Sequence, residues 1–343
     1  MAKFTGFDIG LSGVLPLDVI IPCAQAAERL GFQRVWIAES YHARGVFTNL
    51  AVVAQQTQSI GLGTGIISPY TRHPGILAME AATLDEVSGG RFTLGLGTAY
   101  AQLNKHQVRD AKPITALREA IEMVRMLIRG EGDSYTGKVF TFGGSGVSLT
   151  MEPVRRDLPI YVGSMGPKTL EMASAAADGI LLNFFLTPAF LKNIAMPAIR
   201  KGTERAGKDL DRYDIRSYII TSVDRDRRVA NDAARGLIAS YTARGASEPL
   251  RYQAAGIEDE ERIEIGDRMR KLFDQGDAKQ AEACVPDGWV DKLAVSGTPD
   301  DVCEKFNAFA AEGLKAPACY QVFGPNRLDA IELLAKEVVP HFL

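Results

Sequence analysis

Short apolar runs rich in β-branched residues recur along the chain, each followed by a stretch whose apolar residues return every three or four positions. The first pattern is typical of a buried strand and the second of an amphipathic helix. Eight strands are expected, at Phe4–Gly10, Arg34–Ala38, Ile60–Ile67, Phe92–Gly97, Pro159–Gly163, Gly179–Phe184, Ile215–Ser222 and Ala318–Phe323. The helices are expected at Leu17–Leu30, Phe47–Thr57, Gly75–Val87, Ile114–Ile128, Lys168–Ala177, Pro188–Ala206, Arg228–Arg244 and Arg327–Phe342.

This alternation predicts an α/β protein with a closed (β/α)8 TIM barrel, because an open doubly wound sheet more often stops at about five to seven strands. Two segments interrupt the pattern. Residues 135–149 mix glycines with aromatic and β-branched residues and predict a β-hairpin, whereas residues 247–287 are charged and predict a helical insertion. Neither has the composition of a linker, so a single domain with two excursions is expected over residues 1–343.

Composition and charge favour small-molecule chemistry. The 39 Lys and Arg residues nearly balance the 42 Asp and Glu residues, and no basic cluster is present, which disfavours nucleic acid as a partner. The four cysteines have no paired spacing, and neither a signal-like segment nor a membrane span is evident, which favours a reducing cytoplasm. The four histidines lack the spacing of metal ligands, so no metal is expected.

Polar residues and glycines gather where the predicted strands end, and in a TIM barrel these carboxyl ends form one mouth that carries the function. The turn after the fifth strand is the most informative, because glycines bracket it and Pro167 suits the first position of the following helix. Free backbone N–H groups and the helix dipole could bind a phosphate there. A tight turn that needs glycine only for its backbone conformation explains the pattern equally well.

An ordered set of motifs resembles one known family. The set comprises Gly31–Tyr41, Leu62–Pro74, Ala82–Gly97, Pro159–Gly179, Val295–Val302 and Lys336–Pro340. Together they cover nearly the whole chain and resemble the bacterial-luciferase-like superfamily, with the methylenetetrahydromethanopterin reductase branch as the nearest match.

This resemblance implies a TIM-barrel oxidoreductase that uses FMN or the deazaflavin coenzyme F420 to carry hydride to or from a small organic substrate. It also implies a homodimer and a separate flavin or F420 reductase or dehydrogenase as a partner. In the family the peptide after the third strand's glycine, here Gly65–Ile66, is cis, and its bulge backs the cofactor ring. The expected cofactor-binding residues are Ser40, Gly65, Ile66, Ser68, Thr98, Gly163, Ser164, Met165 and Gly166, of which the last four match the family's phosphate-binding turn.

Asp8 and Glu39 are the predicted catalytic residues. Asp8 stands at the position matched to a first-strand glutamate that acts as the acid in the reductase branch, and a buried carboxylic acid could donate a proton. Read by itself, Asp8 could equally form a salt bridge with an arginine. The same two readings apply to Glu39.

Two departures from the family concern the identity of the substrate and the contact with the cofactor ring. Relatives often carry an acidic residue followed by histidine after the second strand, whereas this chain has Glu39 and Ser40, with His42 further on. Sugar-phosphate dehydrogenases of the superfamily carry a glutamate where this chain has Tyr100, so glucose 6-phosphate is not the expected substrate.

Three functions stay open at this point. The leading one is hydride transfer without oxygen, the second is a monooxygenase that uses reduced FMN and O₂, and the third is a non-catalytic cofactor-binding paralogue. The third predicts tight ligand binding without turnover.

Overall fold

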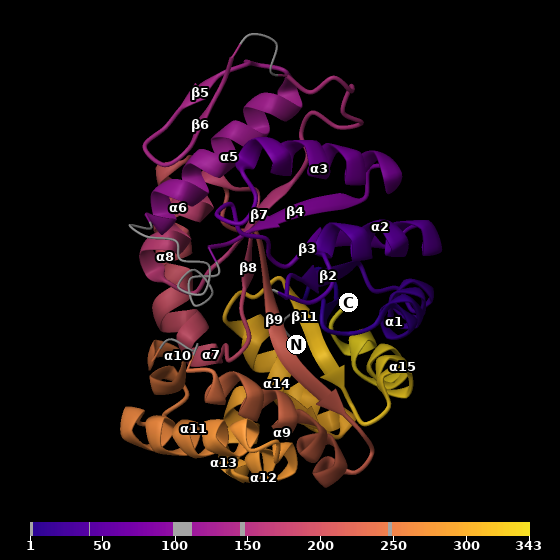
Figure 1. The fold of residues 1–343 in the computed structure, drawn as a ribbon. Helices are drawn as coiled ribbons and strands as arrows, with labels where there is room; N and C mark the ends of the chain where they lie inside the picture. The colour runs from indigo at the N-terminus through magenta and orange to yellow at the C-terminus, as the bar shows by residue number, and fades with distance from the viewer. Residues whose placement is uncertain (1–2, 41, 99–111, 145–147, 246–248) are drawn as a thin grey trace.

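Eight parallel strands close into a barrel surrounded by helices, which confirms the predicted (β/α)8 fold (Figure 1). The computed structural model describes residues 3–40, 42–98, 112–144, 148–245 and 249–343. The barrel strands are β1 (Asp8–Ser12), β2 (Arg34–Ala38), β3 (Gly61–Thr64), β4 (Phe92–Leu96), β7 (Ile160–Gly163), β8 (Gly179–Leu182), β9 (Asp214–Val223) and β11 (Ala316–Phe323). Pairing of β8 with β9 closes the ring.

Helix boundaries follow the start and stop signals that the sequence carries. Pro74, Pro113 and Pro167 each open a helix, where the N–H that proline lacks would have no partner in the helix. Gly31, with φ of 83°, ends the first helix in a left-handed conformation. The helices are α1 (Leu17–Arg29), α2 (Val46–Gln56), α3 (Pro74–Val87), α5 (Pro113–Arg129), α6 (Pro167–Ala176), α7 (Pro188–Phe190), a π-helical turn (Leu191–Ala195), α8 (Met196–Arg205), α9 (Arg227–Ala243), α10 (Pro249–Ala254), α11 (Asp259–Asp274), α12 (Ala278–Ala283), α13 (Asp287–Leu293), α14 (Pro299–Ala311), α15 (Arg327–Glu337) and a 3₁₀ turn (Val339–His341).

The first strand begins at Asp8 and not, as the sequence predicts, at Phe4. The preceding aromatic residues pack outside the barrel instead. The ring of Phe4 lies 5.1 Å from that of Phe342 and the ring of Phe7 lies 5.5 Å from that of Phe306, while the Phe4 N–H donates to the Phe342 carbonyl at 3.1 Å. These contacts tie the amino-terminal segment to the carboxyl-terminal one, and they make Asp8 the first residue of its strand.

The barrel interior pairs glycines with aromatic side chains. A Cβ at Gly63 would come within 2.4 Å of the Trp36 ring, and one at Gly10 would come within 2.5 Å of the Tyr218 ring. No side chain fits where these rings already fill the space. Glycines on β1 and β3 therefore make room for the large side chains that project from β9 and β2.

The apolar core has two parts, one outside the strands and one inside them. The outer part fills the space between the barrel and its helices and includes Ile9, Leu62, Leu94 and Phe306. The inner part includes Trp36, Tyr218 and Tyr320 in the barrel and continues into Ile238 of α9 and Tyr252 of α10. This continuity means that α9 and α10 pack over the barrel interior and not around its outside.

The helical insertion is therefore longer than predicted and includes α9, which the sequence interpretation assigned to the outer ring. The outer helix before β11 is α14, whose Val302 and Phe306 belong to the outer core. It is preceded by β10 (Val295–Gly297), an unpredicted strand that pairs with Thr221–Val223 of β9. The sequence interpretation failed here because an amphipathic helix has the same periodicity whichever surface it covers.

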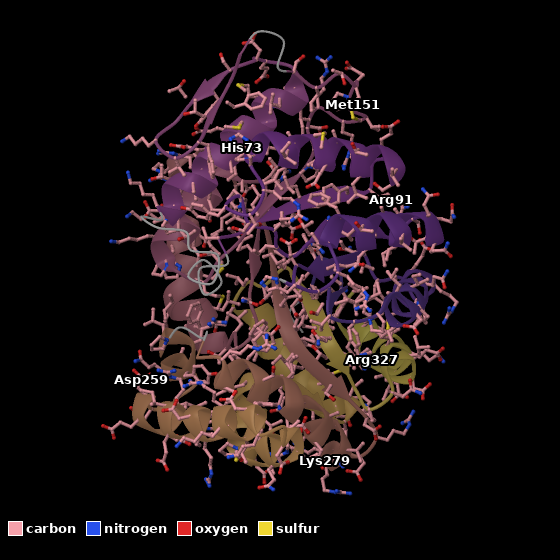
Figure 2. The ribbon with its side chains drawn as sticks, in the orientation of Figure 1. His73, Arg91, Met151, Asp259, Lys279 and Arg327 are labelled. Atoms are coloured by element: carbon pink, nitrogen blue, oxygen red, sulfur yellow. The ribbon has the colours of Figure 1, made fainter. Side chains whose placement is uncertain are left out.

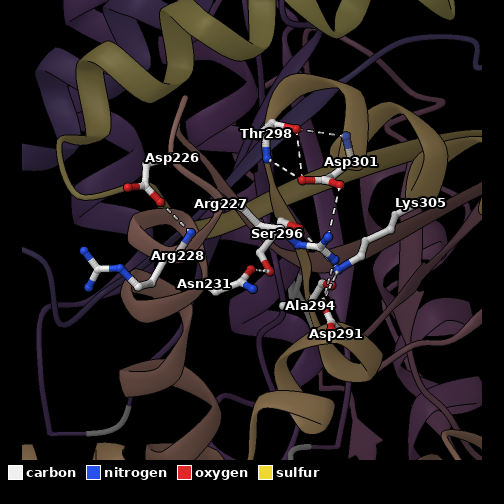
Figure 3. Close-up of polar contacts among 10 residues, drawn as sticks. All are labelled: Asp226, Arg227, Arg228, Asn231, Asp291, Ala294, Ser296, Thr298, Asp301 and Lys305. Carbon is white, nitrogen blue, oxygen red and sulfur yellow. Dashed lines mark hydrogen bonds and ion pairs between the residues drawn. The ribbon is translucent and has the colours of Figure 1, made fainter.

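Polar contacts join the two ends of this insertion, and we call them the neck (Figure 3). The Asp224 N–H donates to the Gly297 carbonyl at 3.2 Å, and the Ser296 hydroxyl donates to the Asn231 side chain at 2.7 Å. Arg227 lies 3.6 Å from Asp301, whose carboxylate also caps α14. The insertion thus leaves and rejoins the barrel at one point.

The predicted hairpin is present as β5 (Tyr135–Thr136) and β6 (Thr141–Phe142), which pair antiparallel. Glu119 of α5 holds its turn by accepting the backbone N–H groups of residues 138–140 at 2.7 to 3.0 Å. The ring of His73 stacks on Phe142. His73 beside the hairpin, and Asp259 on the insertion, lie on opposite sides of the barrel (Figure 2).

Candidate active site

Most of the predicted cofactor-binding residues lie together at the carboxyl ends of β2, β3, β4 and β7. The Gly65 N–H donates to the Ile37 carbonyl of β2 at 2.8 Å, and Ile67 forms an isolated parallel bridge with Leu96 of β4. Val162 of β7 pairs with Leu96 on its other side. These strands bring Ser40, Gly65, Ile66, Thr98 and Gly163 to one mouth.

Ile66 forms an apolar floor within this mouth. Its side chain is half-buried and fills the space that a Cβ would need at Gly97 and at Gly163, where the nearest Ile66 atoms would be 2.7 and 2.5 Å away. The peptide bond Gly65–Ile66 is cis, which confirms the prediction. A flat ring could rest on this floor, because the Ile66 side chain presents an apolar surface.

The glycine-bracketed turn leads into α6 as predicted. Gly166 precedes the helix, no side chain caps it, and an added Cβ would meet nothing closer than the Thr169 hydroxyl at 3.9 Å. One predicted donor is already engaged, because the Gly166 N–H donates to the Ser164 hydroxyl at 3.2 Å. The open amino end of α6 is compatible with an anion such as a phosphate.

Two other predicted residues support the mouth from within the fold. The fully buried Ser68 hydroxyl donates to the Thr98 carbonyl at 3.2 Å and accepts the Tyr70 N–H at 3.3 Å. Met165 is buried, and its sulfur accepts the Asn183 N–H at 3.2 Å. Ser68 and Met165 therefore shape the turns around the floor.

Glu39 follows β2 and pairs with Arg72. Glu39 Oε1 lies 2.7 Å from Arg72 Nη1, and Arg72 Nε lies 3.3 Å from Glu80 Oε2. Burial raises the pKa of Glu80, and the Glu39 charge raises it further, although Arg72 opposes both. The second oxygen of Glu39 is buried and has no hydrogen-bond partner among the described residues, so it could accept one from a ligand.

Asp8 does not lie at the mouth, and the prediction that it does is wrong. Its fully buried side chain lies at the amino end of the barrel, where both carboxylate oxygens are 2.7 Å from Arg216 Nη1. Trp36 Nε1 donates to Asp8 Oδ2 at 2.7 Å. Burial lowers the pKa of Arg216, but the charges of Asp8 and Asp214 outweigh this effect and raise it overall, so the guanidinium stays charged. Of the two readings of Asp8, the salt bridge is the one that the structure supports.

The distance along the strands also separates Asp8 from the turn that follows β7. Asp8 begins β1, whereas Ser164 follows the carboxyl end of β7. The position above Asp8 on the same face of β1 is Gly10, and the rings of Tyr218 and Tyr320 fill the space beside it. Asp8 is therefore covered from the mouth and has no route to a substrate there.

Tyrosine and serine hydroxyls at the mouth were missed by the sequence interpretation. Tyr320 of β11 and Tyr241 of α9 place their hydroxyl oxygens 3.2 Å apart, and Ser12 of β1 lies 2.8 Å from Ser40, oxygen to oxygen. The Tyr218 hydroxyl is buried, without a hydrogen-bond partner among the described residues. Alternation along β9 and β11 could have shown that Tyr218 and Tyr320 point inward.

A cavity of about 420 Å³ lies elsewhere, between α7, α13, β10 and α14. Ile219, a residue of the outer core, lines it from β9, and Phe309 and Leu293 add apolar surface. Its polar residues Lys305 and Asp291 lie 3.3 Å apart and neutralise each other. The cavity thus lies on the other side of the β9 wall from the mouth, and we do not assign the reaction to it.

Several expectations concern other parts of the chain. Tyr100, on which the view of glucose 6-phosphate depends, lies outside the described residues. His73 accepts the Gly75 N–H at 3.1 Å and so caps α3. Within the described ranges, no cluster of His, Cys, Asp and Glu side chains could hold a metal ion. No helix in that same part of the chain is long and apolar enough to cross a membrane.

Comparison with known proteins adds independent information. The family model described as luciferase-like monooxygenase matches residues 3–316. The 5,10-methylenetetrahydromethanopterin reductase of Archaeoglobus fulgidus is 33% identical over 315 residues, which is 92% of each chain. The F420-dependent glucose-6-phosphate dehydrogenase of Nakamurella multipartita is 29% identical over 92% of this chain and 90% of its own.

A solved structure extends the similarity to three dimensions. The coenzyme F420-dependent tetrahydromethanopterin reductase of Methanopyrus kandleri is 30% identical, and the match covers 100% of both chains with a TM-score of 0.89. The whole architecture, including both excursions, therefore falls within this alignment.

Proposed function

The chain belongs to the family of luciferase-like monooxygenases, and from this membership we propose that it is an oxidoreductase that moves hydride between coenzyme F420 and a small organic substrate. When bound, the deazaflavin would accept or supply the hydride. The protein itself would bind the ring, orient the substrate and manage the accompanying proton.

The Ile66 floor is the observation that carries this proposal. Its side chain lies against Gly97 and Gly163 and offers an apolar surface where a ring could lie. The unpartnered Glu39 oxygen and the Ser40 hydroxyl stand at the end of the neighbouring strand β2 and would contact polar groups of the ring. Ser164 and the open start of α6 would hold a phosphate.

Anaerobic titration of the purified protein with F420 and with FMN, each oxidised and reduced, tests the cofactor. We expect F420 to bind at least about tenfold more tightly than FMN, which corresponds to ~1.4 kcal/mol. Tighter binding of reduced FMN, together with O₂ consumption, would establish the monooxygenase function in its place. Tight F420 binding without turnover of any substrate would instead favour the non-catalytic paralogue.

The substrate class is tested with the two substrates that appear in the names of the relatives. We propose reduction of a methylene-bridged tetrahydropterin, because the 33% identical relative is a 5,10-methylenetetrahydromethanopterin reductase. Reduced F420 should be oxidised on addition of 5,10-methylenetetrahydromethanopterin, followed by the rise in visible absorbance and fluorescence that the oxidised cofactor gives. Glucose 6-phosphate with oxidised F420 is the contrast, and activity with it alone would contradict this choice.

Assembly is also part of the proposal. Ile76 and Met79 lie one turn apart on α3 and are 47% and 45% exposed, so two large apolar side chains stand next to each other on the surface of this helix. We propose that this face of α3 joins two copies in a homodimer. Sedimentation of the wild type and of Ile76→Lys would test it, since the charge should release monomers.

The remaining features of the proposal concern the chain and its surroundings. The inner core runs without a break from the barrel into α9 and α10, which supports one domain with two excursions. We also propose a location in the reducing cytoplasm, which the four free cysteines support. A separate F420 reductase or dehydrogenase would restore the redox state of the cofactor between turnovers.

A further inference from the structure

The cavity between α7, α13, β10 and α14, which we call the outer cavity, has the form of a ligand site that the proposed reaction does not use. Its volume of about 420 Å³ falls within the ~300 to 1,000 Å³ of small-molecule pockets. Buried apolar side chains form its base, among them Leu186, Ile219, Val295 and Phe309. The apolar body of a ligand would be removed from water there, which favours binding.

Charged side chains stand at the rim of the outer cavity. Among the described lining residues they are Lys292, Lys305 and Asp291, so positive charge exceeds negative charge by one. Lys292 donates to the Gly256 carbonyl at 2.9 Å and forms no ion pair with any carboxylate in the described part of the chain. A negatively charged group on a ligand would balance this rim.

Lys305 is the cation best placed to hold such a group. Its side chain is only 22% exposed, and its Nζ lies 3.3 Å from Asp291 and 3.2 Å from the Ser296 carbonyl. Burial lowers the pKa of Lys305 and the Arg227 charge lowers it further, while Asp291 opposes both effects without cancelling them. An additional negative charge beside this ammonium would therefore be stabilised.

Asp291 can release Lys305 to a ligand and keep a cation as its partner. Its Oδ1 lies 3.5 Å from Arg227 Nη2 as well as 3.3 Å from Lys305 Nζ, so it stands between two cations (Figure 3). Asp301, 3.6 Å away, is a further partner of Arg227. The Asp291 side chain is 47% exposed, so a turn toward Arg227 leaves its carboxylate in water and costs little.

We propose that the outer cavity is a second binding site, which takes a small organic anion with an apolar body and a carboxylate head. The apolar body would lie on the base of the cavity, and the carboxylate would bind Lys305 in place of Asp291.

This site is separate from the mouth of the barrel. Ile219, which lines the outer cavity, belongs to the outer core, whereas its neighbours Tyr218 and Ile220 belong to the inner core. The strand β9 thus stands between the two sites. The inference therefore does not depend on the proposed oxidoreductase function.

Methyl NMR of the full chain locates the ligand, with octanoate as the probe. Isoleucine δ1 methyl groups would carry ¹³C, and the signals of Ile219 and Ile66 would be assigned from their loss in Ile219→Val and Ile66→Val. Octanoate should shift the signal of Ile219, which lines the outer cavity, and leave that of Ile66, which lies at the mouth. A shift at Ile66 alone, or no shift at either residue, would overturn the proposal.

A neutral probe of the same length tests the carboxylate. In the same NMR titration, 1-octanol should bind about tenfold more weakly than octanoate, which corresponds to ~1.4 kcal/mol. The apolar contacts are the same for both probes, so the difference reports the charge alone. Equal affinities would show that the rim does not recognise a carboxylate and would refute the proposal.

Two substitutions at the rim should change octanoate affinity in opposite directions. Lys305→Met keeps an apolar stem without the charge, so it should abolish the preference for octanoate over 1-octanol. Asp291→Asn removes the competing carboxylate and should tighten octanoate binding by about two- to fivefold, the range expected from losing an exposed ion pair. A general loss of structure cannot explain weaker binding in one variant and tighter binding in the other.

The matched control is Lys279→Met, which removes an exposed lysine of α12 that does not line the outer cavity. Its octanoate affinity should stay within about twofold of the wild type, as expected for a surface substitution away from the site. Wild-type affinity in Lys305→Met, or equal losses in Lys305→Met and this control, would contradict the role of Lys305.

F420 separates this inference from the proposed function. Saturating octanoate should leave the F420 dissociation constant unchanged, whereas competition between the two ligands would place octanoate at the mouth and overturn the second site. A protein that binds no F420 would disprove the proposed function, and the octanoate titrations would still decide whether the outer cavity binds an organic anion.

Discussion

The two ends of the barrel interior differ in how their most buried polar side chains are paired. At the amino end, Asp8, Arg216 and Trp36 satisfy one another at 2.7 Å, and the carboxylate is fully buried. At the carboxyl end, the Tyr218 hydroxyl and one Glu39 oxygen are buried without hydrogen-bond partners among the described residues. Unpaired buried atoms are also present at the amino end, on Arg34 and Asp214, but those of Tyr218 and Glu39 stand near the mouth, where a ligand could complete their bonding.

Breaking the amino end should have the largest effect. Asp8→Ala would leave Arg216 buried beside Asp214 alone, and removing one partner of a buried ion pair costs about 3 to 5 kcal/mol. We expect this loss in the free energy of unfolding measured with urea. Asp209→Ala is the control, because its exposed pair with Arg212, 3.7 Å apart, should contribute less than about 1 kcal/mol.

Measuring the F420 affinity of the same variant tests whether the two ends of the barrel act separately. If the amino end is purely structural, folded Asp8→Ala protein should bind F420 as the wild type does. An affinity loss as large as the stability loss would mean that the two ends are not separate.

A glycine at the carboxyl end should have the next largest effect. The new methyl group in Gly163→Ala would come within 2.5 Å of Ile66 and displace the floor, so we expect F420 to bind about tenfold more weakly, or ~1.4 kcal/mol. Gly288→Ala is the matched control, since a Cβ there meets no atom within 4 Å. Unchanged F420 affinity in Gly163→Ala would remove the floor from the site.

The smallest effect concerns the unpartnered phenol. Burial raises the pKa of Tyr218 well above its usual value, so above pH ~10 ionisation of the unfolded chain favours unfolding and stability falls as pH rises. Tyr218→Phe removes this group together with an unsatisfied hydroxyl. We expect its unfolding free energy at pH 7 to match or exceed the wild type by up to about 1 kcal/mol, and to decline less steeply above pH 10.

Differential scanning calorimetry across this pH range would measure both effects. A Tyr218→Phe variant that is destabilised by several kcal/mol at pH 7 would show that the hydroxyl has a partner after all. The contrast between the two ends would then disappear.

The sequence predicts those features that depend on neighbouring residues. Alternation located all eight barrel strands, and Pro167 correctly marked the start of α6. The errors came from distant contacts. Phe4 reads as part of a strand because it is apolar, yet its partner is Phe342 at the other end of the chain.

The candidate site was likewise predictable only where its residues lie within a single motif. The turn after β7 and the Gly65–Ile66 bond lie within single motifs, and both are found where the motifs place them. The misplacement of Asp8 followed from the misplaced start of β1. The hydroxyl pairs Ser12–Ser40 and Tyr241–Tyr320 each join residues far apart in the sequence, so no local pattern could reveal them.

The neck makes the insertion structurally separable from the barrel. Because Asp224 and Gly297 meet through one hydrogen bond of 3.2 Å, the roughly seventy residues between them form a loop whose ends coincide. Evolution could replace the whole insertion while the eight strands remain a closed barrel. A chimera in which the segment between β9 and β10 comes from another barrel enzyme would have new substrate contacts, while its cofactor-binding residues stay unchanged.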